Sequence, residues 1–132
     1  MTVTAGVVSG AVTVGESTSP DYTATVSASA GTITQRERRH LQLTVSGGAT
    51  PTVTITPPDG ITKATFFWCK GTDPNGDEAA FSIEWNNSAA IDIDDCTELL
   101  WASKSAATGL TQVEITNLSA TVVLNIEYII AG

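Results

Sequence analysis

The sequence predicts an all-β protein: a two-sheet antiparallel sandwich of jelly-roll type with an extended N-terminal arm. Short segments in which apolar and polar residues alternate recur along the body of the chain, and this period of two places one face of each strand in a core. Clusters of Gly, Pro, Asn, Asp and Ser separate these segments, as turns do. Thr, Val and Gly are frequent, and they favour strands and turns over helices.

The N-terminal residues 1–37 differ from the body, residues 38–132, because their side chains are small and large apolar residues are nearly absent. Such a segment can add strands at a sheet edge, but it has little apolar surface to bury alone. We interpret it as an arm that pairs with a neighbouring subunit's sheet. Its candidate contacts are Val7, Val8, Val12 and Val14. Two ordinary strands of the same domain, or a mobile tail, are the alternatives.

The first three body strands are expected at residues 39–46, 52–56 and 62–70. The second ends at Pro57-Pro58-Asp59-Gly60, which is a strong turn signal. The third is the most aromatic, and both of its faces are apolar. It is therefore either central or in contact with another subunit, and its candidate interface residues are Phe66 and Trp68.

The next three strands are expected at residues 80–86, 90–94 and 98–102. In the first of them Phe81, Ile83 and Trp85 alternate with polar residues and should point inward. A short helix over residues 97–103, capped by Thr97, is the alternative for the last.

The last two strands complete a set of eight. One contains Val113 and Ile115, and the other runs over residues 120–130. The longer one is apolar along a whole face, so we expect it to cross a sheet near its middle. That face consists of Val122, Leu124, Ile126, Tyr128 and Ile130. Eight strands fit a jelly roll of two four-stranded sheets. An immunoglobulin-like sandwich is the alternative, although Cys69 and Cys96 are close together for its paired cysteines.

Composition excludes several kinds of partner. The chain has six basic residues and a net charge of -8, whereas a nucleic-acid binder needs a positive patch, so we expect neither direct nucleic-acid binding nor an acidic membrane partner. No apolar run approaches the roughly 18 residues of a membrane span. The N-terminus lacks the pattern of a secretory signal, so we expect a cytosolic product. Cys69 and Cys96 should then be reduced, with a disulfide as the alternative.

Few residues could carry chemistry, and we predict no enzyme, no cofactor and no metal. His40 is the only histidine, and no Gly-x-Ser-x-Gly motif accompanies it. The loop at residues 73–78 departs from calcium-binding loops, so we interpret it as a turn. We interpret Asp92, Asp94 and Asp95 as residues on the solvent-exposed face of a strand.

Two groups of residues suggest binding. Arg36, Arg38 and Arg39 hold half of the positive charge and could dock onto carboxylates of a partner; internal pairing with Asp and Glu is the alternative. Three tryptophans could form a platform for a sugar. Trp85 and Trp101 share strand faces with large apolar residues and are expected in the core, which leaves Trp68 as the exception.

The body from Leu41, above all residues 55–68 and 113–128, resembles jelly-roll decoration (cement) proteins of tailed bacteriophages and β-rich modules of phage fibres. The resemblance is general and includes no diagnostic motif, so no residue role is transferred. It implies a non-enzymatic structural virion protein, assembled in the host cytoplasm, that clamps neighbouring coat subunits as a homo-oligomer. Its partners would be the major capsid protein or other virion subunits. A host-glycan-binding module of a phage fibre or adhesin is the alternative.

Overall fold

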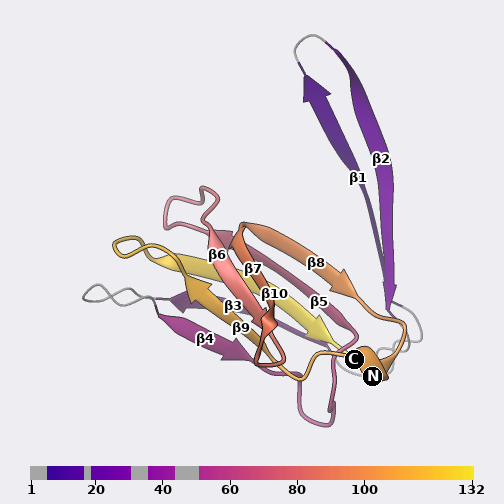
Figure 1. Ribbon diagram of the computed structural model, residues 1–132, viewed down its shortest axis with the longest axis vertical. Coiled ribbons are helices and arrows are strands. Elements are labelled where there is room, and N and C mark those ends of the chain that lie inside the picture. Colours follow the sequence, from indigo (N-terminus) through magenta and orange to yellow (C-terminus); the bar gives the residue numbers. More distant parts are fainter. Residues whose placement is uncertain (1–5, 17–18, 31–35, 44–50) are drawn as a thin grey trace.

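The computed structural model describes the backbone of residues 6–16, 19–30, 36–43 and 51–132. Side chains are described for residues 40–43 and 51–132, apart from 89–92 and 106. Within these ranges the chain is almost all β, with one 3₁₀ turn at Ala106–Thr108 and no α-helix. Two four-stranded antiparallel sheets pack face to face as a sandwich, which confirms the predicted all-β, two-sheet class (Figure 1).

The first sheet has the strand order β3-β10-β5-β8. Its strands are β3 (Arg36–Leu43), β10 (Leu124–Ala131), β5 (Phe66–Thr72) and β8 (Glu98–Ala102). The second sheet has the order β4-β9-β6-β7. Its strands are β4 (Thr52–Ile55), β9 (Val113–Asn117), β6 (Phe81–Trp85) and β7 (Ser88–Cys96). β10 lies between β3 and β5, so the expectation that it crosses a sheet near its middle is confirmed.

The core lies between the sheets and takes alternate residues from both. Phe81, Ile83 and Trp85 are buried as predicted, and so are four of the five residues on the predicted apolar face of β10. The exception is Val122, which is 40% exposed because the strand begins only at Leu124. Each large apolar side chain buried in this layer contributes about 1.5–3 kcal/mol to stability.

Several boundaries and one element type differ from expectation. β5 begins at Phe66 instead of residue 62, because Ala64 pairs with Leu110 in an isolated bridge as the chain passes between the sheets. β3 begins at Arg36, so the expected division between residues 37 and 38 falls inside a sheet strand. The helix considered for residues 97–103 is wrong, because 98–102 is strand β8 and pairs with β5.

Residues N-terminal to the sandwich form a two-stranded antiparallel hairpin, β1 (Gly6–Glu16) and β2 (Ser19–Ala30). Its register pairs Gly6 with Ala30 at one end and Val14 with Tyr22 near the other. In Figure 1 the hairpin extends away from the two sheets, and β2 contacts β8 at its base. Val7, Val8, Val12 and Val14 lie on β1, but their side chains are outside the described residues, so the arm stays a prediction.

Candidate functional site

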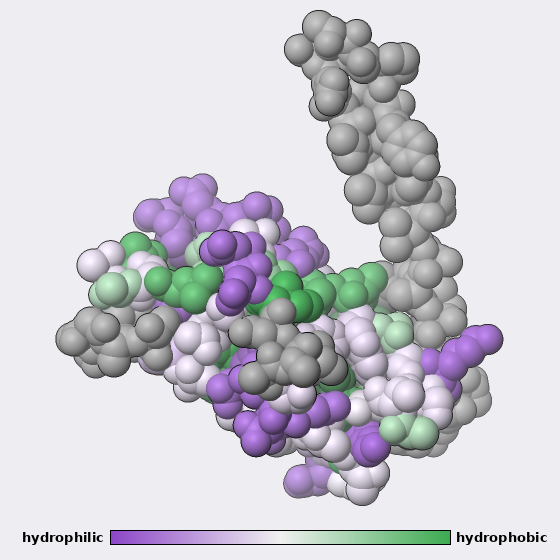
Figure 2. Space-filling model, viewed as in Figure 1, coloured by the Kyte–Doolittle hydropathy of each residue, from purple (hydrophilic) through white to green (hydrophobic). Residues whose placement is uncertain are grey.

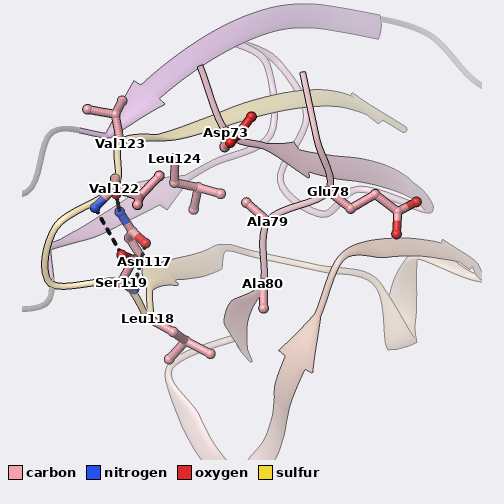
Figure 3. A pocket seen from close by; sticks show the side chains of 10 residues that line it. All are labelled: Asp73, Glu78, Ala79, Ala80, Asn117, Leu118, Ser119, Val122, Val123 and Leu124. Carbon is pink, nitrogen blue, oxygen red and sulfur yellow. Dashed lines mark hydrogen bonds between the residues drawn. The ribbon is translucent and has the colours of Figure 1, made fainter. Parts of the chain in front are cut away.

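An open pocket of about 400 Å³ lies at one end of the sandwich, where the β5–β6 loop meets the β9–β10 connection (Figure 3). The loop contributes Asp73 and Glu78, and the connection contributes Leu118 and Val122. Figure 2 shows hydrophilic residues over the β5–β6 loop beside hydrophobic ones over the β9–β10 connection. Carboxylates and apolar side chains therefore share one small surface.

A tight turn shapes the acidic side of this pocket. Gly76 donates its N–H to the carbonyl of Asp73 at 3.0 Å and has a φ of 91°, as in a type I turn followed by a left-handed glycine. Oδ1 of Asp73 accepts the backbone N–H of Asn75 at 2.8 Å and of Asp77 at 2.9 Å. Partial desolvation of Asp73 opposes its ionisation, but these hydrogen bonds outweigh it and lower the pKa of the carboxyl. Asp73 therefore carries a charge and also holds the turn.

Buried Asn117 shapes the apolar side. Its side chain is 1% exposed, donates Nδ2–H to the carbonyl of Val122 at 3.0 Å and accepts the N–H of Ser119 at 2.9 Å (Figure 3). The Ser119 hydroxyl accepts the N–H of Val122 at 2.9 Å. This ordered connection presents Leu118 and Val122, which are 41% and 40% exposed and are the exposed large apolar residues among the described side chains. No sequence signal marked these residues as a site.

A second candidate surface is the outer face of the first sheet. Phe66, which is 7% exposed, and Ala131 form an apolar cluster separate from the core, with Trp68 packed against it. The rest of the cluster consists of Leu100, Ala102 and Ile129. Trp68 donates Nε1–H to Oε1 of Glu98 at 2.8 Å. The structure thus places the predicted interface residues Phe66 and Trp68 together, on the face away from the core.

The predicted basic residues lie at the start of β3, an outer strand of the same sheet. Arg36 pairs in register with Ala131, Arg38 with Ile129 and Arg39 with Tyr128. Their side chains are outside the described residues, so neither docking nor internal pairing is tested.

A smaller pocket of about 190 Å³ lies between the sheets, next to two tryptophans. Trp85 and Trp101 pack edge to face with their ring centroids 5.6 Å apart, and Leu110 and Ile93 also line the pocket. Trp85 is 5% exposed, as expected for a core residue, yet its Nε1–H has no hydrogen-bond partner among the described groups. An unpartnered buried donor of this kind is unusual in proteins.

Of the groups considered for chemistry, Asp73 and Glu78 of the acidic loop line the larger pocket, whereas His40, Asp94 and the two cysteines line neither pocket. His40 is exposed on β3, and Asp94 accepts the hydroxyl of Ser82 at 2.8 Å. Cys69 and Cys96 are free thiols, so the disulfide alternative is wrong. Burial, with a further contribution from nearby Cys96, raises the pKa of the Cys69 thiol and keeps it protonated. Among the side chains described, no three His, Cys, Asp or Glu residues gather in a way that could hold a metal ion.

Comparison of this chain with family models, with curated proteins and with solved structures found no match in any of the three. Within the described residues no helix has the length and apolar character needed to cross a membrane. What the chain does is therefore inferred from its strand order, its surfaces and its charges.

Proposed function

We propose that this chain is a jelly-roll capsid decoration (cement) protein of a tailed bacteriophage, a non-enzymatic virion component that clamps neighbouring coat subunits. The strand pairing is the observation that carries the proposal. The pairs β3·β10, β4·β9, β5·β8 and β6·β7 are nested inside one another, so the body is one long hairpin folded into two sheets. Eight antiparallel strands wrapped into two four-stranded sheets are the architecture of jelly rolls, which recur in viral capsid domains and lectins.

Two features supply contacts for a clamp. The outer face of the first sheet offers the apolar cluster around Phe66 and Trp68. The β1–β2 hairpin is a two-stranded sheet of its own, and such a hairpin is only marginally stable in water. Pairing of a hairpin edge with a strand of a coat subunit would stabilise the hairpin, which would then act as the predicted arm, ending before Arg36. Because the contacts span subunits, binding favours the assembled shell over loose subunits.

The non-enzymatic part of the proposal rests on how the reactive groups are placed. His40, the chain's one histidine, is exposed and lines neither described pocket. Cys69 is buried and protonated, which makes it a poor nucleophile. A nucleophile needs a base within hydrogen-bond reach, and no such pair lines either pocket.

Co-sedimentation with empty, expanded shells of the phage that encodes the chain tests the proposal. We expect saturable binding at a fixed ratio to the coat subunit. Trp68→Lys, which places a charge in the apolar cluster, should weaken binding at least tenfold. Thr54→Lys adds the same charge at an exposed position on the other sheet and should bind like the wild type. Shells that pellet without the chain would refute decoration.

A host-glycan-binding module is the second candidate, and the Trp85–Trp101 pocket favours it. Sugars present apolar ring faces to aromatic side chains, and the rings of Trp85 and Trp101 line this pocket. A glycan array with the isolated protein tests this function. Trp85→Phe keeps an aromatic ring but reduces the aromatic surface that lines the pocket, so it should weaken any glycan signal while the protein stays folded. If the array shows no binding, this candidate fails.

A further inference from the structure

We infer that copies of this chain associate head to tail: the pocket end of one sandwich, with Glu78, Leu118 and Val122, binds the opposite, basic end of a second copy. The inference rests on the separation of charge along the strands and on the exposed apolar rim of the pocket. It stands independently of the proposed function.

The strand register defines the two ends. At one end Arg36, Ala131, Phe66 and Ala102 are paired in a single row across the first sheet. Towards the other end Asn125 of β10 pairs with both Gln42 and Thr72. Six residue steps along β10 separate the two rows, which at 3.3 Å per residue is about 20 Å. In Figure 1 the β5–β6 loop and the C-terminus accordingly lie at opposite ends of the sandwich.

Basic residues gather at the first of these ends. Arg36, Arg38 and Arg39 begin β3, Lys63 precedes β5 by three residues, and Lys104 follows β8 by two. These are five of the six basic residues of the chain. The described members remain accessible: Lys104 is exposed, and half-buried Lys63 donates to the uncharged carbonyl of Ala107 at 3.0 Å.

Acidic residues gather at the pocket end. The β5–β6 loop holds three of them, and three more lie where β7 ends and β8 begins. They are Asp73, Asp77, Glu78, Asp94, Asp95 and Glu98. The β5–β6 loop lies beyond the Asn125 row and so about 20 Å or more from the Arg36 row, which exceeds the Debye length of roughly 8 Å at physiological salt. Arg36 and the loop carboxylates therefore cannot neutralise each other within one chain, whereas Glu98 pairs in register with Lys70. Each end therefore carries charge that a partner can complement.

The pocket adds apolar contact to this charge. Leu118 and Val122 remain about two-fifths exposed although the hydrogen bonds of Asn117 and Ser119 order the backbone around them. A preformed surface loses little entropy when it binds, so modest contacts can suffice. An apolar patch beside carboxylates suits a basic segment with aliphatic stems, because Arg side chains pack their methylenes while pairing their charge.

A second copy is the occupant that fits best. Contact between two pocket ends would place like charges together, and so would contact between two basic ends. Only the head-to-tail arrangement pairs opposite charges, and this heterologous interface generates either closed rings or open filaments.

Sedimentation velocity at physiological salt tests the inference with two charge reversals. Glu78 is exposed on a loop, and Arg38 lies on an outer strand. Glu78→Arg and Arg38→Glu should each weaken self-association at least tenfold. Mixed together, the two variants should associate again, because the intact basic end of a Glu78→Arg chain can bind the intact pocket end of an Arg38→Glu chain.

Two further variants complete the design. Glu114→Arg makes the same charge change in the middle of the second sheet and should associate like the wild type. Leu118→Ser removes apolar contact without a charge change and should weaken association. A wild-type chain that stays monomeric up to about 1 mM overturns the inference, because its Kd would then lie above that value. A mixture of the Glu78→Arg and Arg38→Glu variants that stays monomeric also overturns the inference.

Discussion

Glu84 lies in the middle of a row of acidic residues across the second sheet, paired with Glu114 of β9 on one side and with Asp92 of β7 on the other. Like charges directly opposite each other destabilise a sheet. Glu84→Lys should therefore raise the free energy of unfolding by about 0.2–1 kcal/mol per relieved pair, measured by urea denaturation. Glu84→Gln should give a smaller increase, and a decrease in both variants would contradict this account.

Asn86 and Asn87 form the two-residue turn between β6 and β7, and both have positive φ, 53° and 54°. Asn86 also accepts the backbone N–H of Thr111 at 2.7 Å and its hydroxyl at 3.0 Å. Replacement of either residue by Ala loses the preference of Asn for this conformation. Only Asn86→Ala also loses the bridge to Thr111, so it should be about 1–2 kcal/mol less stable than Asn87→Ala in thermal or urea unfolding.

Cys69 makes stability depend on pH above neutrality. Its thiol has a folded-state pKa raised above the ordinary value of 9.0, chiefly by burial. Above pH 9 the unfolded chain releases the proton while the folded chain keeps it, so the free energy of unfolding should fall by up to ~1.4 kcal/mol per pH unit. Urea denaturation at several pH values between 8 and 10.5 should show a shallower decline for Cys69→Ala. Equal slopes in the two proteins would argue against a protonated, buried thiol.

At the scale of elements, Gly71 of β5 shows how closely the sheets approach. A Cβ at this position would lie 2.6 Å from Cδ1 of Phe81 and 2.7 Å from the carbonyl oxygen of Ala79. Overpacking of this kind costs about 1–3 kcal/mol, so Gly71→Ala should lower the midpoint of thermal unfolding. In a Phe81→Leu background, Gly71→Ala should lower the unfolding midpoint by less than it does in the wild-type background. If the penalty is the same in both backgrounds, the ring is not what excludes the Cβ.

The strands could be predicted where alternation was strong and failed where turns intervened. β6 and β8 follow the expected segments closely, because the alternation of apolar residues continues to both ends of each strand. β10 starts four residues late, since the hydrogen bonds of Asn117 and Ser119 hold residues 117–122 in a turn and leave Val122 in solvent. Alternation reports which residues fit a strand, but side-chain hydrogen bonds to the backbone decide where it begins.

For the whole molecule, the hairpin and the sandwich should be separable. The hairpin pairs only with itself among the described strands, and β2 contacts the sandwich at β8. Deletion of residues 1–35 should therefore change the free energy of unfolding of the sandwich by less than about 1 kcal/mol, within the range of local contacts. Under the proposed function, the truncated chain should also lose most of its binding to shells. Collapse of the fold on truncation would instead make the hairpin part of the domain.

The pattern of apolar residues was sufficient to predict the class of the protein, because alternating apolar residues can be buried only by packing one face of each strand against another layer. It also identified the central strand, the inward residues of β6, and Phe66 with Trp68 as surface candidates. The tertiary structure decided what depends on contacts between distant segments: the nested pairing β3·β10 to β6·β7, the edge-to-face packing of Trp85 on Trp101, and the pocket between two loops. It also decided the separation of charge, since residues as far apart as Arg36 and Lys104 come to one end only through strand register. Local periodicity reports which residues are buried, whereas register and loop packing determine which residues become neighbours.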